Sequence, residues 1–249
     1  MKQKLQQALV DGFAKYFPGA ELPVTFFFAD EPPPGIQPEP KSKGWHCFMG
    51  YLARARKGES LCLDEPALGC GKRFCGFPVA QRPDFEFFLS IGIPGKMEGE
   101  RYKKSPAIVK ELMRNWPDWR APAKYLVLKR WDFIAEGDRP EAAIFFAKPD
   151  VLSGLFTLAN FAETDPFGVI APFSAGCGSV IQYPFLENQK ESPKCVLGMF
   201  DVSARPAVGA GELTFAVPMR KLEGMIADLA ESFVITRSWE KVMRRLEQP

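Results

Sequence analysis

The chain has 249 residues, of which 46% are hydrophobic and 25% charged, and its formal net charge is +2. This composition is typical of a soluble globular protein, and the small net charge argues against a dedicated nucleic-acid-binding surface. No apolar run is long enough to span a bilayer, and the first residues lack the apolar centre of a signal peptide. We therefore expect a cytoplasmic protein with no nucleic-acid or membrane partner, whose six cysteines are reduced thiols or metal ligands.

The first half of the chain predicts helices and strands in alternation. Apolar residues at helical spacing predict a helix over 5–17, which Pro18 ends. The run VTFFFAD (24–30) predicts a strand, and SLCLD (60–64) predicts a shorter one. Between these strands, a proline-rich loop leads into a predicted helix over 45–58.

The next elements are a strand, a polar loop and a helix. FEFFLSIGIP (85–94) is interpreted as a strand that ends in proline, and MEGERYKKSP (97–106) as a loop. Ser105 and Pro106 are a typical cap and first-position pair, and they predict a helix that continues over 107–116.

The second half again predicts strands and helices, with Asp150 as a helix cap. The predicted strands cover 124–133, 142–149, 195–202 and 213–218, and the predicted helices cover 150–163, 219–233 and 238–248. The fold class is therefore α+β, with mixed sheets and helices packed against them.

The two halves also share their order of elements, because each places Gly-Cys-Gly after a helix and a short strand. The separation from Phe48 to Gly69 equals that from Leu155 to Gly176, and SIGIP in the first half corresponds to TFAVP in the second. We expect a single domain over 1–249 with an internal duplication, whereas the alternative is an accidental recurrence of a tripeptide. The predicted repeats and C-terminal helix cover 22–120, 121–232 and 233–249.

Several kinds of active site are excluded. A phosphate-binding P-loop would need glycine at Pro66 and a hydroxyl at Arg73, and a dinucleotide fingerprint would need glycine at Phe74. His46 is the only histidine, so no site with two imidazoles can form within one chain. Its neighbour Cys47 would project from a different side of the helix, which disfavours a catalytic dyad.

The cysteines remain as the reactive side chains. Cys70 and Cys177 each lie between two glycines, and Cys47 lies on a predicted helix. We expect these three residues to be thiolate ligands of an iron–sulfur cluster or another metal, with the glycine turns directing N–H groups at sulfur. The alternative is that glycine forms a turn and cysteine packs beneath it. Cys75 has ferredoxin-like spacing from Cys70, but the third cysteine of that pattern is absent. Two cysteines in strand-like runs are interpreted as core residues: Cys62 and Cys195.

A second candidate site is the polar loop before the predicted helix at Ser105. Arg101, Tyr102 and Lys104 could hold an anionic small molecule at a helix start, together with Gly71 and Gly178 of the two glycine turns. The alternative is a solvated loop with one structural ion pair.

Three stretches of the chain resemble the domain-of-unknown-function 169 family of archaea and bacteria over about residues 22–229. They are WHCFMGYLARARKG with LGCGKRFCGF, IPGKMEGERYKKSP, and SAGCGSVIQYPFLEN with VLGMFDVSARP. The resemblance implies no reaction. It implies that Cys47, Cys70 and Gly71 occupy motif positions, as do Arg101 and Tyr102. Many members have Pro-Gly-Gly after the first motif cysteine, where this chain has Gly-Lys-Arg.

Three functions therefore stay open. The first is a cysteine-ligated metal or iron–sulfur protein with a redox or sensing role. The second is an enzyme or binding protein for an anionic small molecule, with a pocket between the two halves. The third is a non-catalytic interaction module.

Overall fold

The structure is a computed structural model that describes residues 3–41 and 47–247. The chain divides into two compact units, of which the larger comprises Met1–Gly76 and Ala121–Pro249 and the smaller comprises Phe77–Arg120. Within the described ranges, no helix is both long and apolar enough to cross a membrane.

A single seven-stranded sheet runs through the larger unit in the order β2-β3-β1-β4-β7-β6-β5. Neighbouring strands pair antiparallel, except that β5 and β6 are parallel. The strands are β1 (Val24–Ala29), β2 (Leu61–Leu63), β3 (Tyr125–Arg130), β4 (Ala142–Ala147), β5 (Val169–Ile170), β6 (Cys195–Gly198) and β7 (Leu213–Pro218). This mixed sheet with its helices confirms the predicted α+β class, and both predicted halves contribute to it.

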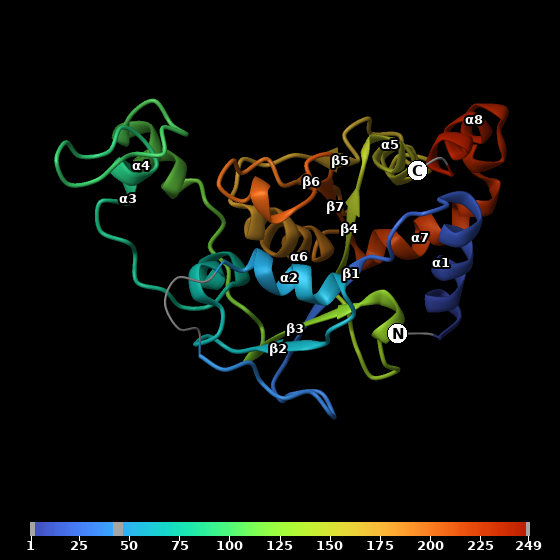
Figure 1. The fold of residues 1–249 in the computed structure, drawn as a ribbon, viewed down its shortest axis with the longest axis horizontal. Helices are drawn as coiled ribbons and strands as arrows, with labels where there is room; N and C mark the ends of the chain where they lie inside the picture. Colours follow the sequence, from blue (N-terminus) through green and yellow to red (C-terminus); the bar gives the residue numbers. More distant parts are fainter. Residues whose placement is uncertain (1–2, 42–46, 248–249) are drawn as a thin grey trace. The chain divides into compact units, whose positions relative to one another are not determined.

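Helices cover both faces of the sheet (Figure 1). On one face lie α1 (Gln3–Tyr16), α5 (Pro149–Ala159) and α7 (Met219–Asp228), and on the other lie α2 (Met49–Arg56) and α6 (Tyr183–Asn188). The chain continues through α8 (Arg237–Leu246), whose N-cap Thr236 accepts a hydrogen bond from the Trp239 N–H. Short 3-10 helices are η2 (Trp131–Phe133), η4 (Arg205–Ala207), η5 (Leu229–Glu231) and η6 (Phe233–Ile235).

The central strand β4 is buried along its whole length, because helices cover both of its faces. The Phe145 ring stacks on Phe13 of α1, with 5.1 Å between centroids. The next residue, Phe146, points the other way, and its ring lies 4.3 Å from the Arg56 guanidinium of α2. Alternate residues of β4 therefore pack against helices on opposite faces of the sheet. Helix α2, which Cys47 precedes, lies on the face that Phe146 contacts.

The smaller unit contains α3 (Phe85–Phe88) and α4 (Pro106–Arg114). The predicted cap is confirmed, because the Ser105 hydroxyl accepts a hydrogen bond from the Ile108 N–H. The strand predicted over 85–94 is wrong. Its first residues form α3, and Gly92 then reverses the chain at a φ of 73° while its N–H donates to the Phe87 carbonyl.

The internal duplication is not confirmed. The segments after α2 and α5 each continue through a short edge strand into a Gly-Cys-Gly sequence, and β2 and β5 form opposite edges of the sheet. However, β2 pairs antiparallel and β5 pairs parallel. The prediction that Asp150 caps α5 is wrong, because the N-cap position is Lys148 and Asp150 lies in the first helical turn.

Candidate functional site

The first Gly-Cys-Gly sequence begins a 3-10 helix, η1 (Gly69–Cys75). Gly69 adopts a φ of 54°, which only glycine adopts at no steric cost. Gly71 has a different reason to be glycine, because an added Cβ would lie 2.8 Å from the Cβ of Phe48. The two glycines therefore turn the chain and press η1 against the residue that follows Cys47.

Cys47 and Cys70 meet at this contact. Cys47 lies close enough to Cys70 to affect the ionisation of the Cys70 thiol, as does the Phe48 backbone N–H. Cys47 is exposed and Cys70 is half-buried. Burial raises the pKa of the Cys70 thiol, the Phe48 N–H lowers it, and the charge of a Cys47 thiolate raises it again. The pair is thus open to solvent at Cys47.

The second Gly-Cys-Gly sequence is helical, which corrects the prediction of a glycine turn. Cys177 has a φ of −64° and a ψ of −30°, and it leads into the π-helix η3 (Gly178–Gln182), which continues as α6. Pro184 lies in the first turn of α6. Because proline has no N–H and its ring clashes with the carbonyl four residues earlier, the wider π-turn fits here. Turns of this kind are frequent at functional sites.

Close packing explains the glycines of this second sequence as well. An added Cβ on Gly178 would meet the Ser174 hydroxyl and lie 3.0 Å from the Phe74 ring of η1. Helices η1 and η3 are in contact. The structure therefore brings the two Gly-Cys-Gly sequences together, and it fills the space above Gly71 and Gly178 with protein side chains.

Four cysteines lie close enough to influence one another: Cys47, Cys70, Cys75 and Cys177, which we call the thiol cluster. Cys75 and Cys177 are buried. Burial raises the pKa of Cys75 well above its usual value, and the charges of Cys177 and Cys70 raise it further. Burial also raises the pKa of Cys177 well above its usual value, and the charges of Cys70, Cys47 and Asp201 raise it further. The buried members of the cluster are therefore neutral thiols at neutral pH.

Asp201 is the acidic side chain beside this cluster. Its carboxylate accepts hydrogen bonds from the Gly176 N–H at 3.1 Å and from the Ser203 N–H and hydroxyl. The carboxylate thereby fixes the loop after β6 to the start of the second Gly-Cys-Gly sequence.

The described residues contain no group of three or more His, Cys, Asp or Glu side chains that is placed to hold a metal ion. His46, which the sequence left as a candidate partner of Cys47, lies outside the described residues.

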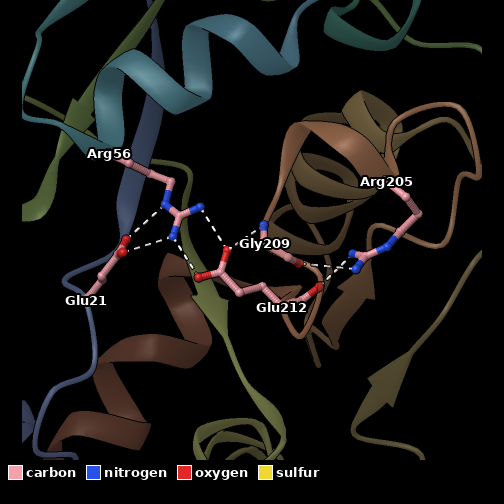
Figure 2. Close-up of polar contacts among 5 residues, drawn as sticks. All are labelled: Glu21, Arg56, Arg205, Gly209 and Glu212. Carbon is pink, nitrogen blue, oxygen red and sulfur yellow. Dashed lines mark hydrogen bonds and ion pairs between the residues drawn. The ribbon is translucent and has the colours of Figure 1, made fainter. Parts of the chain in front are cut away.

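Helix α2 carries the residues next to Cys47, and its charged side chains hold it in place (Figure 2). The Arg56 guanidinium lies between two carboxylates, with bonds of 2.9 Å to Glu21 and 3.0 Å to Glu212. The Glu212 carboxylate also accepts the Gly209 N–H, and Arg205 donates to the Glu212 carbonyl. Arg56 thereby ties α2 to the chain segments before β1 and before β7.

Two further side chains of α2 reach the surrounding loops. The Tyr51 hydroxyl donates to the Ala67 carbonyl at 3.0 Å, close to the start of η1. Arg54 makes a bidentate pair with Glu39, with bonds of 2.7 and 3.0 Å. The helix that precedes η1 is therefore fixed at its middle and at its C-terminal end.

The other predicted site residues lie in the smaller unit. Arg101 and Lys104 are exposed, and Tyr102 is half-buried. Arg101 has a φ of 54°, and its backbone N–H donates to the Ser90 carbonyl at 2.9 Å. Because a non-glycine residue rarely adopts this conformation, Arg101 is a point of backbone strain in its loop.

The two cysteines that we interpreted as core residues are fully buried. Cys62 packs with Phe27, Tyr125 and Val127 on one side of the sheet, and Cys195 belongs to the large core around α5 and α7. Both interpretations are confirmed.

Sequence reasoning missed Cys75 and Asp201. The sequence does not single out Cys75, because its spacing fits no complete ferredoxin pattern, although it ends the 3-10 helix that contains Cys70. Asp201 is remote in the sequence from every cysteine of the thiol cluster, so no local signal marks it.

A family model for DUF169, described as "Uncharacterised ArCR, COG2043", matches residues 19–228. No curated protein and no solved structure matches the chain significantly.

Proposed function

The chain belongs to the DUF169 family, and we propose that it binds a thiophilic metal ion or an iron–sulfur cluster through the thiol cluster, with a redox or sensing role. The supporting observation is that four cysteines from three separate chain segments lie near one another, because η1 contacts η3 and Cys47 lies close enough to affect the ionisation of Cys70 and Cys177. Cys47, Cys70 and Cys177 are the expected ligands, and Cys75 is a fourth thiol within the same cluster.

The electrostatics of the cluster favour the binding of a cation. The side chains that shift these pKa values are the other thiols and the Asp201 carboxylate, and all of them oppose ionisation. A bound cation stabilises thiolates directly, because a thiol that coordinates a metal is deprotonated. Exposure of Cys47 would leave one side of the ion accessible to a reactant.

Metal analysis of protein purified without oxygen tests this proposal. We expect bound metal, with visible absorbance and acid-labile sulfide if a cluster is present. The Cys70→Ala and Cys177→Ala variants should lose the metal. The matched controls are Cys62→Ala and Cys195→Ala, which also remove buried thiols but lie outside the cluster. Wild-type protein that stays metal-free after anaerobic incubation with zinc(II), or with iron and sulfide, would overturn the proposal.

A second candidate function is reversible dithiol chemistry, which the proximity of Cys47 to Cys70 favours. Hydrogen peroxide would oxidise the two thiols to one disulfide, with the release of two water molecules, and a small dithiol would reduce it again. Peptide mapping after peroxide treatment should then find a Cys47–Cys70 disulfide. Metal-free protein with this disulfide would favour the second candidate.

The strained backbone of Arg101 favours a separate anion site in the smaller unit, in which Arg101, Tyr102 and Lys104 hold an anionic small molecule. One cavity within the larger unit is apolar, lined by Leu, Phe, Met and Ile side chains of α1, α5, α7, η5 and β4, and these side chains offer no group for an anion. Inorganic phosphate and small carboxylates are suitable probes. A thermal shift with these probes that disappears in Arg101→Ala would support the site. Protein that shows no thermal shift and binds no metal would favour the third function, a non-catalytic interaction module.

A further inference from the structure

Two methionine sulfurs lie beside the second Gly-Cys-Gly sequence. If Gly176 carried a Cβ, that atom would lie 3.1 Å from the Sδ of Met199 and 3.5 Å from the Sδ of Met49. Both methionines are buried. Met49 follows Cys47 by two residues and Gly176 directly precedes Cys177, so the thioethers lie near the chain segments that carry two cysteines of the thiol cluster. Glycine at position 176 is what allows both sulfurs to approach the backbone.

The backbone at Met199 is held in an unusual conformation. Its φ is 67°, in a region that side-chain-bearing residues rarely adopt. The Met199 N–H donates to the Ser179 hydroxyl at 3.4 Å, and the Ser179 hydroxyl donates to the Gly176 carbonyl at 2.8 Å. Such strain persists only where the surrounding structure enforces it. The chain thus accepts a strained residue at the position that carries this sulfur.

We infer that the metal of the thiol cluster is a soft monovalent ion of the copper(I) type, for which Met49 and Met199 supply thioether ligands beside the Cys47, Cys70 and Cys177 thiolates. This inference rests on the proposed function. Thiolate and thioether sulfur select copper(I), whereas zinc(II) takes thiolate, imidazole and carboxylate ligands.

The charge of the site points in the same direction. Each thiolate ligand adds a negative charge and must release a proton before it binds the ion. A thioether adds a donor without adding charge and without releasing a proton. Two thioethers therefore complete the coordination of a monovalent cation at less electrostatic cost than two further thiolates.

Competition titrations of reduced, metal-free protein test the inference. Copper(I) is titrated against a chromophoric copper(I) chelator without oxygen, and zinc(II) against a chromophoric zinc chelator. We expect the Met49→Leu/Met199→Leu double variant to lose at least about tenfold in copper(I) affinity and to keep the wild-type zinc(II) affinity. Met225→Leu is the matched control, because Met225 is also buried but belongs to the core around α7.

A second measurement does not depend on affinity. Silver(I), a redox-inert analogue of copper(I), is added to protein with 13C-labelled methionine methyl groups, and the resonances of the eight methionines are followed by NMR. The signals of Met49 and Met199 should shift, whereas that of Met225 should not. Unmoved Met49 and Met199 signals, or an unchanged copper(I) affinity in the double variant, would overturn the inference.

The design separates this inference from the proposed function. Protein that binds zinc(II) or an iron–sulfur cluster through its cysteines but does not bind copper(I) would refute only the thioether site. Protein that binds none of these metals would refute the proposed function itself.

Discussion

The backbone of Gly71 lies directly against Phe48, so that an added Cβ on Gly71 would be 2.8 Å from the Phe48 Cβ and 3.1 Å from its Cγ. This contact places η1 beside the residue that follows Cys47. It also allows the Phe48 N–H to reach the Cys70 sulfur. The absence of a side chain at Gly71 therefore decides whether Cys47 and Cys70 can lie close together.

Replacing Gly71 with alanine should separate these residues. The new methyl group overlaps a fully buried aromatic side chain, and such overpacking costs about 1–3 kcal/mol of unfolding free energy. We expect a lower denaturant midpoint and a Cys70 thiol that alkylates faster than in the wild type. Gly224→Ala is the control, since its Cβ would meet open space within α7 and should stabilise the protein by about 0.5–1 kcal/mol. Equal midpoints for wild type and Gly71→Ala would contradict the packing argument.

The Gly-Cys-Gly sequences show how far local sequence reasoning reaches. Composition and spacing correctly predicted most helices and strands, because apolar periodicity reports which face of an element is buried. They also singled out Cys47, Cys70 and Cys177. The same reasoning predicted glycine turns, although only Gly69 among the four glycines has a positive φ. The other three are required by close contacts with distant side chains, which no local pattern contains.

The parts of the site that escaped prediction depend on long-range contacts. The Asp201 carboxylate accepts a hydrogen bond from the Gly176 N–H, which lies 25 positions away in the sequence. Met49, from the first half of the chain, packs beside the same glycine. Likewise, the strand predicted over 85–94 has aromatic residues suited to a sheet, but its last part contains Gly92 in a conformation that reverses the chain. Tertiary contacts decide such cases, and they become visible only in the folded chain.

Arg56 should contribute more to stability than a surface ion pair. Its side chain is 17% exposed, as is that of Glu212, so Arg56→Ala would leave a half-buried carboxylate with fewer partners. We expect a loss on the order of 1–3 kcal/mol, measured by chemical denaturation. Arg114→Ala is the matched control, because the Arg114–Glu111 pair is 75% and 62% exposed and should contribute almost nothing. A similar small effect for both variants would show that the Arg56 network does not anchor α2.

Exposure predicts the order in which the cysteines react. Cys47 is exposed, Cys70 is half-buried, and the other four are buried. Brief treatment of reduced, metal-free protein with iodoacetamide should therefore label Cys47 first and Cys70 more slowly. The buried thiols should react only in denaturant, as peptide mass spectrometry would reveal. Early labelling of Cys75 or Cys177 in native protein would be incompatible with this packing.

Substitutions at Arg101 separate backbone strain from side-chain function. Arg101→Gly removes the side chain and also relieves the positive φ, so we expect unfolding at a higher temperature than for Arg101→Ala, which keeps the strain. If the guanidinium holds an anion, both variants should lose the thermal shift caused by phosphate or a small carboxylate. Retention of that shift in both variants would exclude Arg101 from an anion site.

Metal binding and apo-protein stability should depend on pH in opposite directions. The pKa values of Cys70, Cys75 and Cys177 are raised above the usual 9.0, chiefly by burial, so these thiols carry protons near neutral pH. A metal must displace those protons, and its affinity should rise about tenfold per pH unit for each proton released. In the metal-free protein, the unfolded chain loses its thiol protons above about pH 9 while the folded chain retains them. Stability from these thiols is therefore complete below that pH and falls above it.

Both trends can be measured on the same preparation. Chelator competition between pH 6 and 8 gives the affinity, and proton release into weak buffer gives the number of thiols that ionise. Urea denaturation of metal-free protein between about pH 8 and 10 gives the stability, where Cys177→Ala should make the alkaline decline shallower because it removes one thiol with a raised pKa. Metal affinity that does not change with pH, together with no proton release, would mean that the ligands are not the buried thiols of this cluster.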